Sequence, residues 1–215
     1  EKQAQRSKDT LAEYWRKLKE VFRDQAGHLA ASYLVGMVAL FLLFGVLSYV
    51  SDVLESTYDI LGLKKGFVLA VPVFSMALTS YLSGLLLCDK QSLWKPIIVG
   101  AMFATAVCLA LLPLFAELVP YMTVLFFLGI SIGIVLPPIN SLITGATSTD
   151  RRGMITCLYG TVRFFGVAIG PPTFGLAIEQ GKWFLFLGSA AIAIVAAITA
   201  LFGITPPSIS EYTAE

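Results

Sequence analysis

The sequence predicts an all-α, polytopic membrane protein with six transmembrane helices. Of its 215 residues, 57% are hydrophobic and only 13% are charged, and the mean hydropathy is +0.80. A soluble domain of this length could not bury so much apolar surface, because its own surface must still face water. The charged residues are also unevenly placed, and they leave six stretches long enough to cross the hydrocarbon core of a bilayer.

Residues 1–27 precede the first apolar stretch and are predicted to contain an amphipathic helix in the cytoplasmic interface. Four apolar side chains recur at helical spacing on one face: Leu11, Trp15, Leu18 and Phe22. Basic residues occupy the rest of the helical wheel, which suits anionic lipid head groups. A basic linker that only sets topology explains the pattern equally well.

The next six elements are apolar runs whose ends are set by charged residues. The first run, of about 22 residues, is too long for the core of a signal peptide and follows a polar segment, so it is a genuine span. The six spans form a bundle over 28–204, and residues 205–215 are predicted to be a cytoplasmic tail. The predicted spans are 28–51, 66–88, 95–115, 120–143, 153–177 and 183–204.

The basic residues predict the orientation of the bundle. With six spans, both termini lie on one side, together with eleven Lys and Arg residues, whereas the opposite side holds three. Positive residues collect on the cytoplasmic side. We therefore expect a multi-pass protein of the cell inner (plasma) membrane with both termini cytoplasmic.

Prolines inside the spans favour interrupted helices. Pro72, the pair Pro137-Pro138 and the pair Pro171-Pro172 each remove backbone donors from an apolar run. Interrupted spans are typical of transporter binding sites, although ordinary kinked packing gives the same pattern. Asn140 follows the first pair, where its amide can hydrogen-bond in a cavity or between helices.

Arg163 is the charged residue within the fifth span, about ten residues from its start. An arginine near mid-membrane costs roughly 2.5–3.5 kcal/mol on insertion scales and usually faces a cavity. A structural role, tying carbonyls or a carboxylate between helices, is the alternative. No acidic residue lies mid-span in this chain, so a carboxylate partner must come from a substrate or from another six-span unit.

Enzymatic and metal chemistry find little support in the sequence. Gly129-Ile-Ser-Ile-Gly133 fits the G-x-S-x-G nucleophile pattern, but Ser131 lies mid-span and the single histidine, His28, lies at the mouth of the first span. Close helix packing by Gly129 and Gly133 is the favoured interpretation. The three cysteines fit packing roles, and nucleotide-binding and metal motifs are absent from the sequence, so no cofactor and no metal are predicted.

Several motifs resemble the drug exporters of the major facilitator superfamily. The fifth span, Gly166-x3-Gly170-Pro171-x2-Phe174-Gly175, resembles their G-x3-G-P-x2-G-G antiporter motif, and Tyr159-Gly160-x2-Arg163 is similar to their eleventh span. The Asp89-Lys90 turn resembles their cytoplasmic loop motif, although Leu85 and Ser92 stand where glycines are expected and the paired arginines are absent.

A cytoplasmic latch is the structural role considered for that turn. In it Asp89, beside Lys90, pairs with Arg151 and Arg152 or with the start of their helix, while plain topology-setting charge is the alternative.

The resemblance implies that the chain is the C-terminal six-helix half-bundle of a major facilitator transporter, built from two inverted three-helix repeats. It implies proton-coupled efflux of amphiphilic drugs or small molecules by alternating access. The implied partners are an N-terminal six-span half, protons, the lipid bilayer and a small amphiphilic substrate, and nucleic acid is not among them. The first, second, fourth and fifth spans would then line the cavity. The candidate lining residues are Arg163, Asn140, Tyr33, Met37, Phe41 and Phe164.

Two alternatives remain from the sequence. A six-span protein acting alone would be a homodimeric transporter or a membrane scaffold that transports nothing. The first residue, Glu1 rather than Met, favours a fragment. A membrane enzyme is disfavoured by the single histidine and by the absence of a mid-span acid pair.

Overall fold

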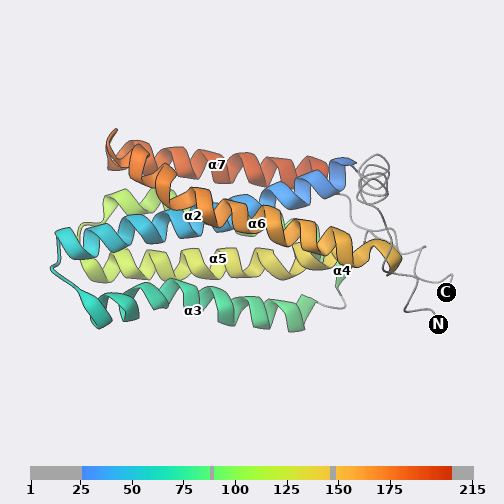
Figure 1. Ribbon diagram of the computed structural model, residues 1–215, viewed down its shortest axis with the longest axis horizontal. Helices are drawn as coiled ribbons and strands as arrows, with labels where there is room; N and C mark the ends of the chain where they lie inside the picture. The colour runs from blue at the N-terminus through green and yellow to red at the C-terminus, as the bar shows by residue number, and fades with distance from the viewer. Residues whose placement is uncertain (1–25, 88–89, 146–148, 205–215) are drawn as a thin grey trace, which may run out of the picture.

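The computed structural model describes residues 26–87, 90–145 and 149–204, and almost all of them are helical (Figure 1). Six of the helices are long and apolar enough to cross a membrane, which confirms the predicted all-α, six-span class. The elements are α2 (Ala26–Ser56), α3 (Gly62–Leu87), α4 (Gln91–Leu111), the short 3₁₀ helix η2 (Leu112–Leu114), α5 (Leu118–Gly145), α6 (Thr149–Ile178) and α7 (Lys182–Gly203). The predicted amphipathic segment and the predicted tail lie outside the described residues.

α2, α3, α5 and α6 are longer than the predicted spans, and the difference is clear at the turn between α2 and α3. The sequence placed the ends of these spans at 51 and 66, whereas α2 ends at Ser56 and α3 begins at Gly62. Charged side chains are tolerated in these end turns because they can reach out of the apolar layer. Here Lys65 Nζ lies 2.8 Å from Glu55 Oε2, so an ion pair links the two helix ends.

The helices pack in a pattern with internal two-fold symmetry. The most extensive contacts join α2 with α6 and α3 with α5, and further contacts join α4 with α5, α2 with α7 and α4 with α7. Exchanging the first three helices for the last three leaves this set of contacts unchanged. In Figure 1, α2 begins at the right-hand end of the bundle and α5 at the left-hand end, so the two units are inverted relative to each other.

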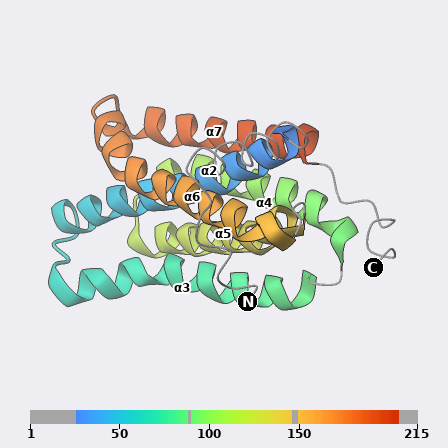
Figure 2. The same ribbon diagram turned by 45° about the vertical axis from the view of Figure 1, so that its right-hand side comes forward.

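α2 is the central helix, and α3 and α6 are the most open. Of the most apolar window of α2, 72% is buried within the bundle, against 17% for α3 and 22% for α6. In both views α3 lies along one side of the bundle and α7 along the other (Figures 1 and 2). The apolar residues that face outward from α3 and α6 are thus available to lipid or to further protein.

Glycines bring two pairs of parallel helices into close contact. On α6, a Cβ at Gly166 would collide with the backbone of α2 at Met37, and one at Gly170 would come within 2.8 Å of the carbonyl oxygen of Phe41. On α5, Gly129 and Gly133 lie in the same way against the backbone of α3. Glycine is needed at these positions because a side chain would separate the backbones.

The Gly129/Gly133 face thus has the packing role that the sequence favoured over catalysis. Ser131, on another face of the same helix, donates a 2.9 Å hydrogen bond to the carbonyl oxygen of Phe127 one turn earlier.

The prolines do not interrupt the helices, contrary to the expectation from the sequence. α5 runs continuously through Pro137 and Pro138, and α3 and α6 likewise contain their prolines without a break. A proline at position i leaves the carbonyl of residue i−4 without its helical donor. In α5 the carbonyls left in this way belong to Gly133 and Ile134.

Two serines of α3 satisfy these two carbonyls. Ser80 Oγ donates to the carbonyl oxygen of Gly133 at 3.0 Å, and Ser83 Oγ donates to that of Ile134 at 3.3 Å. Membrane helices tolerate proline where a neighbouring helix supplies such donors. The continuity of α5 therefore depends on α3, which explains why local sequence rules fail here.

The glycine contacts predict opposite effects of the same substitution at two sites. Gly129→Ala should lower the midpoint of thermal unfolding of the purified protein, because overpacking of a close contact costs about 1–3 kcal/mol. Gly188→Ala on α7 is the matched control, since a Cβ there meets no atom within 4 Å. It should leave the midpoint unchanged or raise it, because alanine favours a helix over glycine. Equal midpoints for the two variants would contradict this account of the packing.

The serine contacts predict a loss of stability that depends on the prolines. Replacing both Ser80 and Ser83 by alanine should destabilise the protein by about 1–2 kcal/mol, given about 0.6 kcal/mol for a typical interhelical hydrogen bond in membranes and the added desolvation of two unpaired carbonyls. Thermal unfolding in detergent would measure the change.

Two comparisons sharpen this measurement. Ser189→Ala is the matched control, because that buried hydroxyl donates within its own helix to the carbonyl oxygen of Leu185. In a background carrying Pro137→Ala and Pro138→Ala, which restores the backbone donors, the serine substitutions should lose most of their effect. A full effect in that background would disprove the proposed role of the hydroxyls.

Candidate transport site between α2 and α6

A polar cluster lies midway along α6, on the face that packs against α2. Tyr159, Arg163, Gly166 and Gly170 follow one another at intervals of four, three and four residues, which places them on one helical face. The two glycines bring α6 close to α2, and Tyr159 is almost fully buried at 2% exposure. The helical repeat thus carries Arg163 to the edge of a tightly packed contact.

The guanidinium of Arg163 is flanked by two aromatic rings. Its Cζ lies 5.6 Å from the ring centroid of Tyr159 and 5.5 Å from that of Phe164. Rings at such distances attract a cation through their quadrupole and offset part of the cost of removing it from water. The flanking rings therefore favour a charge at mid-membrane without supplying an anion.

Two buried hydrogen-bond donors at this place have no acceptor in the described chain. They are Arg163 Nε and the Tyr159 hydroxyl, whose side chains lie beside each other. Buried donors without acceptors are rare and costly. The acidic residues of the described chain lie at helix ends or in the connections, far along the sequence from the centre of a span. The cluster is therefore suited to receiving an acceptor or an anion from outside this bundle.

α2 forms the other side of this contact, which we call the seam between α2 and α6. Tyr33 is buried, and its hydroxyl donates a 2.7 Å hydrogen bond to the carbonyl oxygen of Ile155 on α6. Its ring also contacts that of Tyr159, with the centroids 5.5 Å apart. Met37 and Phe41 are half-buried and lie against Gly166 and Gly170 through their backbones.

The structure brings most, but not all, of the sequence candidates together. Tyr33, Met37, Phe41 and Arg163 meet in the seam between α2 and α6, while the ring of Phe164 is 62% exposed beside the arginine. Asn140 lies on a different helix, α5, at an exposed position, and its backbone carbonyl accepts a hydrogen bond from Thr144.

Sequence reasoning missed Tyr159 as a site residue. Its position four residues before Arg163 was the available signal, because that spacing places both side chains on one helical face.

The antiporter-like motif has a clear packing role. Gly166 and Gly170 form the contact with α2, Pro171 follows them, and Gly175 faces open space. Phe174 stands at the first of the two final glycines of the family motif, and its ring lies against Gly45 of α2. A bulky residue on α6 is thus accommodated by a glycine on the facing helix.

The structure leaves the predicted cytoplasmic latch unassessed. Asp89 and the side chain of Arg151 lie outside the described residues, whereas Lys90 and Arg152 are exposed at the starts of α4 and α6.

These features define a class: a multi-pass membrane bundle of two inverted three-helix units, with a charge at the centre of a span. Six-helix bundles of this kind are the halves of many secondary transporters. The sequence profile of the Major Facilitator Superfamily matches residues 1–171. The chain belongs to this superfamily of transporters, which confirms the resemblance and the prediction that it is not an enzyme.

A curated relative gives more detail. The bacillibactin exporter of Bacillus subtilis (strain 168) is 34% identical to this chain over 194 residues. The match covers 89% of this chain and 48% of the relative, so the chain spans about half the length of that exporter.

Proposed function

We propose that this chain forms the C-terminal six-span half of a secondary transporter that exports small amphiphilic molecules, coupled to proton entry, by alternating access. Membership of the superfamily and similarity to an exporter support the reaction class. The half-length match supports a second six-span half. In this proposal residues 28–204 form the membrane bundle, 1–27 link it to the other half, and both ends of the chain are cytoplasmic.

The buried Nε of Arg163, which has no acceptor in the described chain, is the observation that supports this proposal most directly. A guanidinium offers several donors in a planar fork that matches the oxygens of a carboxylate or similar anion. Arg163 Nε has no acceptor among the described residues, and the ring of Phe164 beside it is exposed. An anionic group with an apolar neighbour would fit this pairing of charge and ring, which favours an amphiphilic substrate with an anionic group.

Proton entry is assigned in this proposal to a carboxylate of the other half. Arginine stays charged at physiological pH, so Arg163 does not carry the proton itself. Pairing of that carboxylate with Arg163 would favour its deprotonated form. Arg163 would therefore promote release of the proton in the state in which the two groups meet.

Substitutions of Arg163 test whether its guanidinium takes part in transport. In the protein as its gene encodes it, Arg163→Ala and Arg163→Gln should lower the efflux rate at least about tenfold, because a hydrogen bond to a charged group contributes about 1.5–3 kcal/mol. Arg163→Lys keeps the charge but not the planar fork and should retain part of the activity. Efflux of a fluorescent amphiphile from cells that lack other exporters would be measured at equal membrane abundance.

Lys182→Gln is the matched control, since it removes one exposed positive charge at the start of α7. It should transport normally. Wild-type efflux by Arg163→Ala would overturn the functional interpretation of this residue.

The mass of the native polypeptide tests the proposed second half. An antibody to residues 1–20 should detect a membrane protein near twice the 23.2 kDa of this chain. A band near 23 kDa would instead favour a six-span protein that acts as a homodimeric transporter or as a scaffold.

A further inference from the structure

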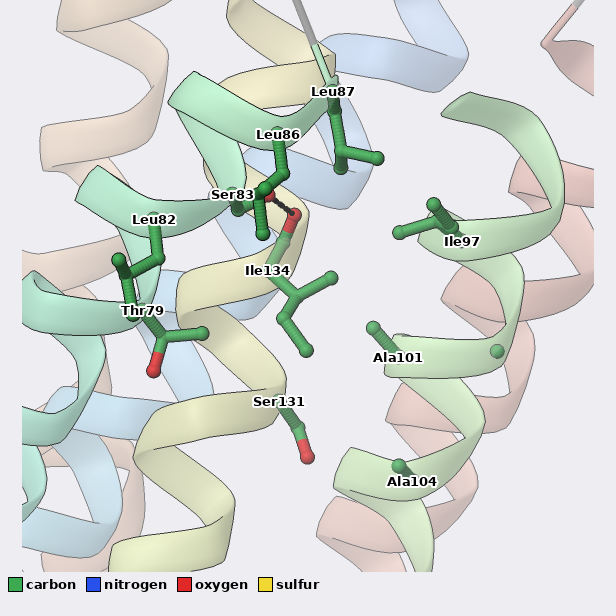
Figure 3. Close-up of a pocket in the computed structure, with 11 residues that line it drawn as sticks. Thr79, Leu82, Ser83, Leu86, Leu87, Ile97, Ala101, Ala104, Ser131 and Ile134 are labelled. Atoms are coloured by element: carbon green, nitrogen blue, oxygen red, sulfur yellow. Dashed lines mark hydrogen bonds between the residues drawn. The ribbon is translucent and has the colours of Figure 1, made fainter. Parts of the chain in front are cut away.

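An apolar groove lies between α3, α4 and α5 (Figure 3). Its volume is about 550 Å³, within the range of pockets that hold one small ligand. α3 contributes one wall, α4 the other and α5 the floor. Residues that line it include Thr79, Ser83, Leu87, Gly100, Ser131 and Ile134.

The groove exists because α3 packs along α5, whereas it is joined to α4 only near its end, where Trp94 Nε1 donates a 2.7 Å hydrogen bond to the carbonyl oxygen of Leu87. The serine and glycine contacts described above fix α3 against α5, while α3 and α4 make few contacts with each other. Three of the four lining residues of α4 are glycine or alanine, and a Cβ at Gly100 would meet no atom within 4 Å. A gap therefore remains between two consecutive helices.

The walls present almost only hydrocarbon surface. Each of the three hydroxyl groups already donates to a backbone carbonyl: Thr79 to Ser75, Ser83 to Ile134 and Ser131 to Phe127. The groove thus has no free hydroxyl donor with which to orient a polar molecule. Its chemistry suits a flexible hydrocarbon chain, which needs contact but no hydrogen bonds.

A cation lies at one end of this hydrocarbon surface. Lys90 directly precedes α4 and follows the Leu87 end of the groove by three residues. Lys90 is exposed, and its backbone N–H donates to the carbonyl oxygen of Leu87, the last residue of α3 and itself part of the groove. A hydrocarbon groove that ends at an exposed ammonium complements an amphiphile with an anionic head.

We infer that this groove binds a phospholipid of the surrounding bilayer that has an anionic head group, with one acyl chain along the groove and the phosphate beside Lys90. Basic side chains at a membrane surface attract anionic lipids in this way. The bound chain would lie against Ser83 and Ile134, where the backbone of α5 relies on a donor from α3. Lipid would therefore stabilise the arrangement of α3 on α5.

Lipid titration of the purified protein tests the inference. The protein as its gene encodes it, in detergent, is titrated with phosphatidylglycerol or phosphatidylcholine, and bound lipid is counted by native mass spectrometry. Phosphatidylglycerol should bind more tightly and should raise the midpoint of thermal unfolding. Lys90→Gln should weaken phosphatidylglycerol binding about fivefold and leave phosphatidylcholine binding unchanged. Gly100→Leu places a side chain in the groove and should weaken the binding of both lipids.

Two matched variants keep the test specific. Lys95→Gln removes a charge at the same end of α4 but off the groove face, and Gly188→Leu adds a side chain at an open position of α7. Both should bind lipid as the wild type does. Equal lipid binding by all variants would overturn the inference. Displacement of the lipid by a transported amphiphile would overturn it in favour of a substrate site.

Discussion

A membrane helix must satisfy its backbone hydrogen bonds without water, and much of this structure depends on how α5 meets that constraint. The proline pair at 137 and 138 leaves two carbonyls without helical donors, and the hydroxyls of Ser80 and Ser83 supply the missing bonds. These bonds and the adjacent glycines hold α3 on α5. The gap between α3 and α4 follows from the same attachment, and with it the apolar groove.

The seam between α2 and α6 is built by similar glycine contacts, but some of its polar groups lack hydrogen-bond acceptors. Its backbone approach is close, and Tyr33 ties the two helices through the carbonyl of Ile155. Its polar centre, however, contains the Arg163 Nε and the Tyr159 hydroxyl, which have no acceptor in the described chain. The hydrogen-bonding groups between α3 and α5 are thus paired within the bundle, whereas the contact between α2 and α6 presents donors to a group outside the bundle.

The sequence was sufficient for the span count and for Arg163, because charge is the strongest signal in an apolar chain. Six long runs poor in charge predicted six helices, and the charge within the fifth run indicated a candidate site. The helix ends were misplaced because a charge was taken as a boundary, whereas Glu55 and Lys65 lie within or at the ends of helices.

The effects of tertiary contacts could not be predicted in this way. The prolines suggested interruption, but the donors that preserve α5 come from a helix some fifty residues earlier in the chain. A serine within an apolar span gives no local sign of such a role. Tyr159 was missed for a related reason, since an aromatic residue in a membrane helix more often faces lipid or packs than forms a site.

The attachment of α3 to α5 also bears on the order in which the chain assembles. During synthesis α3 enters the bilayer well before α5, with most of its surface uncovered and with Ser80 and Ser83 lacking their later acceptors. In that interval each hydroxyl can bond only within its own helix, to the carbonyls of Met76 and Thr79 one turn earlier. Final placement of α3 must therefore wait until α5 has been inserted, so the second helix of the bundle is among the last to settle.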